Sequence, residues 1–171
     1  VIPHPPTFIY AAAVKLGLIS DTHGRVPNGV HEALAGVDHI LHAGDVGPVD
    51  VLTELEAIAP VSAVLGNTDH GLALPETRVE EFAMHKFLIH HIVDVSMPSQ
   101  RVRTLLAEER PDVVVFGHTH YAIVEEYQGI LMVNPGSPSL PKQLQRLGQV
   151  AIMDLEPGHK NAEIIDLSSF S

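Results

Sequence analysis

Apolar runs of strand length recur along the chain, and each of them stops at polar residues. Residues 14–19, 39–42, 61–65 and 113–116 are such runs. Short apolar runs bounded by turn residues are typical of strands that are buried on both faces of a parallel sheet. The pattern therefore predicts a parallel core, with polar side chains gathered where its strands end.

Helix signals lie between these strands. A capping Asn, Asp or Ser accepts a hydrogen bond from the first turn of a helix, and Gly or Pro ends the helix. We therefore predict helices over residues 28–35, 50–59 and 100–110, capped by Asn28, Asp50 and Ser99 and ended by Gly36, Pro60 and Pro111.

The second half of the chain reads mainly as hairpins. Parallel strands joined by helices and followed by hairpins suggest two mixed β-sheets packed face to face, with the helices outside. The predicted fold class is α/β (α+β), a four-layer αββα sandwich. The predicted hairpins pair residues 78–82 with 86–91, 123–127 with 130–134 and 149–155 with 162–167.

Length and composition suit one globular domain. The 171 residues are 45% hydrophobic and 18% charged, and we assign the domain to residues 13–171. Residues 1–12 hold three prolines and lack the positive flank of a signal peptide, so we expect a loose leader there. No apolar run approaches the ~20 residues of a membrane span. The absence of cysteine fits a cytoplasmic protein.

Metal-binding residue types follow the strands, and ligands gather at the carboxyl ends of parallel strands. If Asp21-Thr22-His23 stays extended, both outer side chains point the same way. Without cysteine, only N and O ligands are available, which suit Mn²⁺, Fe or Zn²⁺ better than Ca²⁺. Taken singly, each motif could be an ordinary turn. The candidate ligands are Asp21, His23, Asp45, Asn67, His118 and His120.

Charge limits the partners. The chain carries 10 Lys and Arg against 21 Asp and Glu, a formal net charge of −11. Proteins that bind phosphate backbones usually carry a basic patch, so we expect no nucleic-acid partner. Bound cations would make the field positive only near the ions, and this favours a small phosphate ester as the ligand.

As an ordered set, these motifs resemble the calcineurin-like metallophosphoesterase family, and the likeness runs from about Lys15 to Asp166. A later motif, 134–137, resembles the small single-domain bacterial and archaeal phosphodiesterases. The resemblance implies that Asp45 bridges two metals. Asp21, His23 and His120 would complete one site, and Asn67, His118 and a histidine of the run 86–91 the other.

Two positions depart from the family pattern. The family usually has His-Gly at the end of the strand 86–91, where this chain has His90-His91-Ile92. We assign His91 as the ligand rather than His90, with Ile92 in the glycine position, where it narrows the pocket. Many active relatives also have His directly after the Asn, where this chain has Thr68. A threonine hydroxyl is too weak an acid to donate a proton well near pH 7.

The resemblance implies a metal-dependent phosphoesterase, in which two divalent ions activate a shared hydroxide. We expect Mn²⁺ first, with Fe, Zn or Ni as alternatives. Asn67 could orient the phosphate, and Asp69 or His70 could replace the missing proton donor. The alternative is a weakly active or inactive protein-binding module of the same fold, like the retromer subunit. Hairpin edges could also pair two subunits, and the sequence does not specify the ester.

Overall fold

The computed structural model describes residues 12–141 and 148–170, which form two five-stranded sheets. The first sheet has the order β10-β9-β1-β2-β3. Its first three strands in chain order are parallel, β9 runs antiparallel to β1, and β10 runs antiparallel to β9. The bounds are β1 (Val14–Ile19), β2 (His39–His42), β3 (Val61–Ala63), β9 (Gln149–Glu156) and β10 (His159–Asp166).

The second sheet has the order β4-β5-β6-β8-β7. Its three central strands are parallel, and a hairpin partner flanks them on each side. The bounds are β4 (Thr77–Phe82), β5 (His85–His90), β6 (Val113–Val115), β7 (Ala122–Tyr127) and β8 (Ile130–Pro135).

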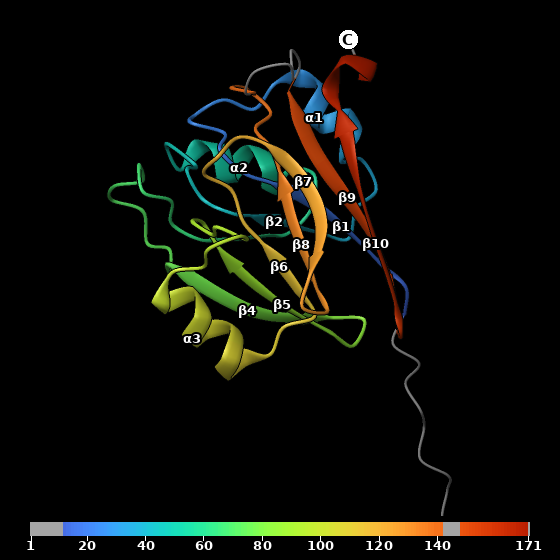
Figure 1. Ribbon diagram of the computed structural model, residues 1–171. Coiled ribbons are helices and arrows are strands. Elements are labelled where there is room, and N and C mark those ends of the chain that lie inside the picture. The colour runs from blue at the N-terminus through green and yellow to red at the C-terminus, as the bar shows by residue number, and fades with distance from the viewer. Residues whose placement is uncertain (1–11, 142–147, 171) are drawn as a thin grey trace, which may run out of the picture.

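The helices cover the outer faces of the two sheets (Figure 1). In this view α1 and α2 lie above, beside the sheet that holds β1 and β2, while α3 lies below, beside β4 and β5. The predicted four-layer αββα sandwich of two mixed sheets is confirmed. The bounds are α1 (Asn28–Ala33), α2 (Asp50–Glu56) and α3 (Gln100–Glu109), with a short 3₁₀ turn, η1 (Leu167–Phe170), at the end.

The core lies between the sheets. Leu18 and Leu41 from the first sheet share one fully buried cluster with Phe87 and Val115 from the second. The opposite faces of the same strands are buried against helices, as expected for parallel strands. Gly17 shows how close this second contact is, because a Cβ there would meet a methyl group of Leu34 at 3.0 Å.

The helix starts follow the prediction in part. Ser99 caps α3 as predicted, and its hydroxyl accepts a hydrogen bond from the Val102 N–H at 3.2 Å. The caps predicted at Asn28 and Asp50 are wrong, since each is the first helical residue of its helix. Pro27 precedes α1 instead, because its ring fixes φ near the observed −61° and its missing N–H costs nothing at a helix start.

The leader predicted at the N-terminus falls almost wholly before the first described residue, Ala12. Residues 1–11 of the leader predicted over 1–12 lie outside the described residues. Among the described residues, no helix is long and apolar enough to cross a membrane.

The core packing makes a stability prediction. Leu18 is fully buried, so Leu18→Ala removes buried methyl groups and leaves a cavity, and we expect a loss of about 2–5 kcal/mol in the free energy of unfolding. Urea denaturation followed by circular dichroism measures it. The control is Val124→Ala on β7, where the side chain is 38% exposed, and equal losses in both variants would contradict this core.

Candidate metal centre

Five strand ends deliver the predicted ligands to one edge of the sandwich. The three parallel strands of the first sheet end there, and so do β5 and β6 of the second. The candidate side chains therefore approach one another from both sheets. Asp21 and His23 follow β1, Asp45 follows β2, Asn67 follows β3, His91 follows β5, and His118 and His120 follow β6.

The backbone of these loops is strained, and the extended geometry expected for Asp21-Thr22-His23 is wrong. Asp21 has φ 55° and His23 has φ 46°, and the His118/His120 pair repeats this with 71° and 62°. Left-handed backbone costs a non-glycine residue roughly 1–2 kcal/mol, and such residues gather at functional sites. The two loops therefore spend stability to turn their side chains toward the common edge.

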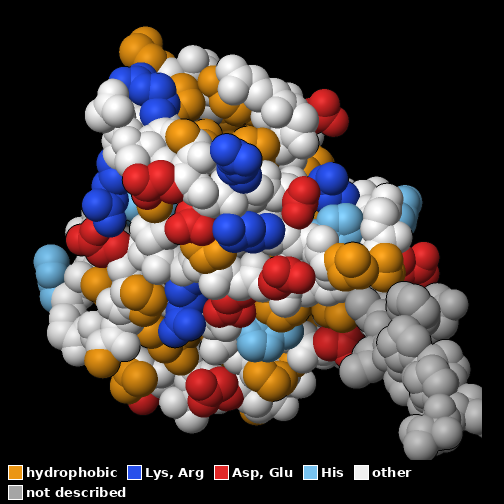
Figure 2. Space-filling view, turned by 90° about the horizontal axis from the view of Figure 1, so that it is seen from below, with side chains coloured by type: hydrophobic (Ala, Val, Ile, Leu, Met, Phe, Trp, Pro, Cys, Tyr) orange, Lys and Arg blue, Asp and Glu red, His pale blue; other side chains and the backbone are white. Residues whose placement is uncertain are grey.

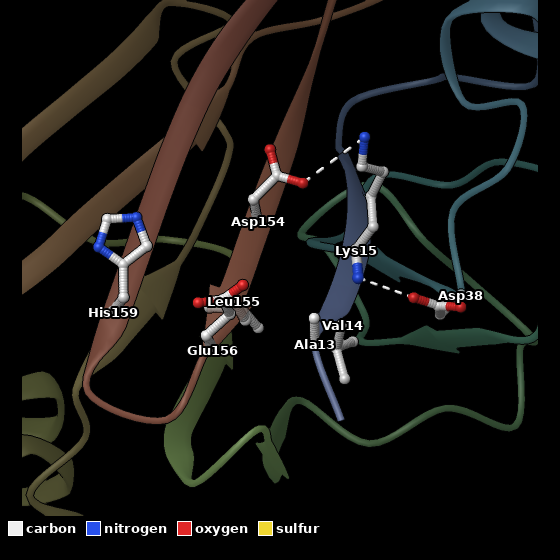
Figure 3. Close-up of a pocket in the computed structure, with 8 residues that line it drawn as sticks. All are labelled: Ala13, Val14, Lys15, Asp38, Asp154, Leu155, Glu156 and His159. Carbon is white, nitrogen blue, oxygen red and sulfur yellow. Dashed lines mark hydrogen bonds and ion pairs between the residues drawn. The ribbon is translucent and has the colours of Figure 1, made fainter. Parts of the chain in front are cut away.

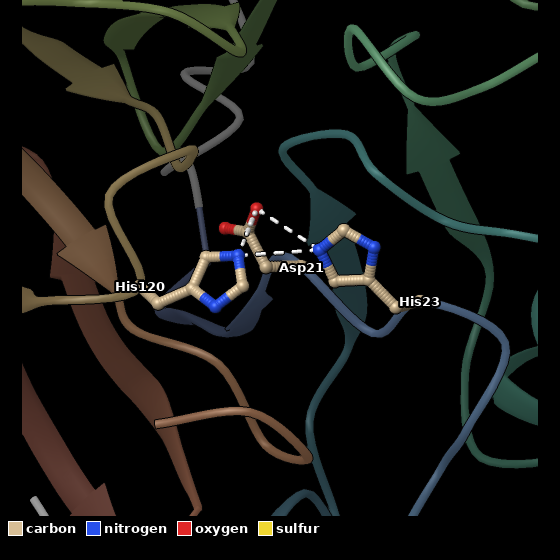
Figure 4. A group of neighbouring side chains, drawn as sticks. All are labelled: Asp21, His23 and His120. Atoms are coloured by element: carbon tan, nitrogen blue, oxygen red, sulfur yellow. Dashed lines mark hydrogen bonds and ion pairs between the residues drawn. The ribbon is translucent and has the colours of Figure 1, made fainter. Parts of the chain in front are cut away.

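One group of ligand atoms consists of Asp21, His23 and His120 (Figure 4). The Nε2 atoms of the two histidines lie 3.2 Å apart. Asp21 Oδ1 lies 3.3 Å from His120 Nε2 and 3.9 Å from His23 Nε2. Two ring nitrogens and a carboxylate oxygen that face one point are a suitable donor set for a borderline divalent cation.

A second group adjoins the first and consists of Asp21, Asp45 and His91. His91 Nε2 lies 3.3 Å from Asp45 Oδ2 and 3.1 Å from Asn67 Oδ1. Asn67 Oδ1 in turn lies 2.9 Å from His118 Nδ1. All seven predicted ligands are thus neighbours. Asp21 belongs to both groups, and Asp45 Oδ2 also lies 3.6 Å from His23 Nε2 in the first.

Backbone carbonyls fix which nitrogen two of the histidines present. His91 Nδ1 lies 2.7 Å from the Ala43 carbonyl, and His120 Nδ1 lies 2.8 Å from the Leu140 carbonyl. A carbonyl only accepts, so each Nδ1–H must donate and each Nε2 is left with a free lone pair. Both histidines are therefore held in the tautomer that can bind a cation.

The neighbouring His90 faces elsewhere. Its Nδ1 lies 2.9 Å from Thr77 Oγ1, and burial lowers its pKa. Since adjacent strand residues point to opposite faces, only one of the pair can reach the cluster. In this structure that residue is His91.

The two carboxyl groups differ in their electrostatics. Burial raises the pKa of Asp21 to about 6, against the opposing effect of His91, and the Asp45 carboxylate adds to the rise. Burial also acts upward on Asp45, but the Thr68 N–H and His91 outweigh it, and the pKa lies below its usual value. Two buried carboxyl groups this close resist joint ionisation without a nearby cation.

Asp69 has contacts that suit a structural task. Its carboxylate accepts hydrogen bonds from the N–H groups of Val46 at 3.1 Å, Gly47 at 3.0 Å and Gly66 at 2.9 Å. It thereby ties the loop after β3 to the loop after β2. Both of its oxygens are occupied by these donors. Its predicted catalytic role stays a prediction.

Thr68 supports Asp45 through both its backbone N–H and its side chain, and both hydrogen bonds lower the pKa of Asp45. The Thr68 N–H donates to Asp45 Oδ1 at 2.9 Å, which leaves Oδ2 facing the histidines. The Thr68 and Asn67 residues are exposed. The open side of the centre therefore lies at this loop.

Two residues of the segment 134–137, which the sequence singled out only as a family likeness, support the centre. Ser137 Oγ donates to the Asp21 carbonyl at 2.7 Å, and Asn134 Nδ2 donates to the Gly117 carbonyl at 3.0 Å. The segment 134–137 therefore fastens both strained ligand loops. Its spacing after a strand was visible in the sequence, but its long-range partners were not.

His42 is a buried structural residue below the centre. The Gly44 N–H donates to His42 Nδ1 at 3.2 Å, so the proton sits on Nε2, which lies 3.0 Å from Thr22 Oγ1. Thr22 Oγ1 donates onward to the Val46 carbonyl at 2.8 Å. Burial lowers the pKa of His42 to about 3. The imidazole thus stays neutral and connects the first two ligand loops.

A cavity at the opposite end of β1 differs in character from the metal centre (Figure 3). It measures about 480 Å³, and Lys15, Asp38 and Asp154 are among the residues that line it. Lys15 Nζ already lies 3.5 Å from Asp154 Oδ1, while the Lys15 N–H donates to Asp38 at 2.7 Å. This acidic cavity has its one lysine already paired, so it does not suit a phosphate.

Comparison with known proteins finds the family that the sequence motifs resemble. The model of the calcineurin-like phosphoesterase superfamily domain matches residues 14–158. A probable metallophosphoesterase of Methanothermobacter thermautotrophicus is 37% identical over 158 residues, covering 88% of this chain and 91% of the relative. The phosphodiesterase YfcE of Escherichia coli is 31% identical over 150 residues, covering 75% of this chain and 82% of the relative.

A solved structure outside the named enzymes shares the fold. It is a single-substitution variant of Vps29 from Entamoeba histolytica, with a TM-score of 0.71 and 20% sequence identity. The superposition covers 89% of this chain and 98% of the Vps29 chain. At this identity the likeness shows the fold alone.

Asp69→Ala tests the structural task of that carboxylate. We expect the metal-free protein to lose about 3 kcal/mol in the free energy of unfolding, because three partly buried N–H groups lose a charged acceptor. Urea denaturation in EDTA measures the loss. The control is His70→Ala in the same loop, whose residue is exposed. Equal stability of the two variants would refute this role for Asp69.

The neutral His42 makes stability depend on pH. The unfolded chain binds a proton at His42 near pH 6.5, while the folded chain does so only near pH 3. The unfolded state therefore binds more protons in this window, and stability falls as pH falls from 6.5. The unfolding free energy of wild type minus that of His42→Asn should fall by about 1 kcal/mol per pH unit between pH 6 and 4. If the unfolding free energies of wild type and His42→Asn change equally with pH between pH 6 and 4, the prediction is wrong.

Proposed function

Because the chain belongs to the calcineurin-like phosphoesterase superfamily, we propose that it is a metal-dependent phosphodiesterase that hydrolyses a small phosphate ester. One observation carries the proposal. Seven N and O donors from five strand ends converge at one edge. Five of them form two adjoining groups that share Asp21, and Asn67 and His118 lie beside the second group. Paired groups of this kind suit two ions, as two-metal phosphoester hydrolysis requires.

The donor set fits a pair of divalent cations. Asp21, His23 and His120 would hold one ion, with Asp45 reaching both positions. Asn67, His91 and His118 would complete the other. Mn²⁺ is our first choice, with Fe, Zn or Ni as alternatives, because mixed imidazole and carboxylate donors suit all of them. When bound, two such ions supply charge for phosphate oxygens and lower the pKa of water.

The residues of this chain set where the phosphate binds. Asn67 and His118 belong to the exposed side of the cluster, whereas Asp21 and Asp45 lie buried behind them. The ester therefore approaches over Asn67, whose amide could donate to a phosphate oxygen. Without cations, the two carboxylates would repel an anionic ester, so we expect phosphate binding to require metal.

The leaving group receives little help from this chain. Thr68 is a weak acid, and the Asp69 carboxylate is held by three backbone N–H groups. His70 is exposed at the rim of a separate cavity of about 450 Å³. We infer that the enzyme prefers esters whose leaving groups need no protonation, such as phenolates.

The surface favours a small substrate over nucleic acid. Lys and Arg side chains on the face shown in Figure 2 are interspersed with Asp and Glu. The net charge of −11 points the same way. Cytoplasmic location and pairing of subunits through the hairpin edges stay predictions.

A protein-binding module is the second candidate, and the fold likeness to Vps29 supports it. Such a module needs no turnover. The complete set of four histidines, two of which have a fixed tautomer, favours the enzyme.

His91→Ala and His90→Ala are a matched pair that tests the enzyme. With bis(4-nitrophenyl) phosphate and Mn²⁺, we expect His91→Ala to lower kcat/KM at least 100-fold, because losing a ligand costs at least as much as losing its hydrogen-bond partner. His90→Ala should stay within about threefold. Calorimetry should also find one Mn²⁺ fewer in His91→Ala.

Three outcomes would contradict the proposal. The ligand assignment fails if His90→Ala loses activity and His91→Ala keeps it. The metal dependence fails if EDTA leaves turnover unchanged. Metal binding without any turnover in wild type would favour the protein-binding module.

A further inference from the structure

Two cavities flank the candidate metal centre, and one exposed side chain contributes to both. A cavity of about 320 Å³ is lined by Asn67, His91 and Ile92 together with other residues. A second cavity of about 470 Å³ is lined by Ile92 and by His118. Each cavity thus reaches a predicted ligand from a different side, and Ile92 stands between them.

The backbone around Ile92 fixes this position. His91 and Val93 are buried, at 3% and 5% exposure, while Ile92 is 46% exposed. The two neighbours are covered by the protein, whereas the Ile92 side chain faces solvent. The Gly117 N–H donates to the His91 carbonyl at 3.0 Å and ties this segment to the second ligand loop. Ile92 is therefore a fixed ridge between the two cavities. The family pattern has glycine at this position, which offers no side chain to form such a ridge.

Both cavities combine apolar walls with negative charge. Leu65 and Glu76 line the smaller cavity, and Ile123 and Glu125 line the larger one. Among the described residues, neither lining contains Lys or Arg. Arg101 pairs with Glu76 at 3.1 Å, but it is not itself part of the lining. These walls would accept neutral or cationic groups and repel anionic ones.

We propose that Ile92 is a specificity-determining residue. It directs the two arms of a phosphodiester into the two cavities on either side of the metal centre, which are called the two grooves below. The substrate class is a diester with two partly apolar arms, neutral or cationic and without further phosphates. This inference rests on the proposed function for the position of the phosphorus atom. A monoester has one arm and fills only one groove.

Binding of non-hydrolysable phosphinates tests the ridge without turnover. Dibenzylphosphinate has two apolar arms, and benzyl(methyl)phosphinate has one. Calorimetry with Mn²⁺-loaded wild type should show about tenfold tighter binding of the two-armed compound, as expected for one added apolar group in a partly open groove. Ile92→Ala and Ile92→Gly should reduce this preference to about twofold.

Val79→Ala is the matched control, because Val79 is an apolar residue on β4 with a similar exposure of 40%. It should keep the wild-type preference. Equal binding of both phosphinates to wild type would overturn the inference, and so would an unchanged preference in both Ile92 variants.

Charge on the arms gives an independent check. Bis(4-carboxybenzyl)phosphinate should bind wild type at least fivefold more weakly than dibenzylphosphinate, because each carboxylate meets an acidic groove. Equal or tighter binding would overturn the assigned substrate class.

Turnover separates this inference from the proposed function. If wild type hydrolyses esters but shows no preference between the phosphinates, the two-groove inference fails and the phosphodiesterase stands. If the two-armed preference holds and neither bis(4-nitrophenyl) phosphate nor 4-nitrophenyl phosphate is hydrolysed, the phosphodiesterase fails and the grooves stand.

Discussion

Two buried carboxyl groups, Asp21 and Asp45, lie side by side where both sheets end, and the rest of the centre depends on how their charge is balanced. Burial and mutual repulsion oppose their joint ionisation, and this raises the pKa of Asp21 to about 6. Among the described residues, the ion-pair partners of these two carboxyl groups are all histidines, and none is Lys or Arg. The donors around them are imidazoles and an amide. Within this set the two carboxylates repel each other, and bound cations would balance their charge.

The scaffold holds these charges at a cost in stability. Strained left-handed backbone occurs at five of the seven candidate ligands. Hydrogen bonds that Ser137 and Asn134 donate, and those that Asp69 accepts, hold the loops in that shape. The buried His42 connects two of the loops without taking a charge. These supports fix the donors before any ligand arrives, which is what preorganised phosphoryl-transfer chemistry requires.

The sequence predicted the layers and the meeting of the ligands because both follow from strand direction. Apolar runs such as 113–116 identify buried parallel strands, and parallel strands must end at one edge. The extended form expected for Asp21-Thr22-His23 failed because period-2 spacing says nothing of a left-handed turn. The hydrogen-bond partners of Asp69 and Ser137 could not be predicted from the sequence either, because they lie on loops that meet only after folding.

The most direct test of the account is a crystal of the Mn²⁺-soaked protein measured at the manganese absorption edge. The account predicts two anomalous peaks roughly 3.5–4 Å apart, as in two-metal hydrolases. Asp21 and Asp45 would lie nearest to both, with His120 at one and His91 at the other. Well-ordered manganese bound elsewhere, with none between these carboxylates, would contradict it.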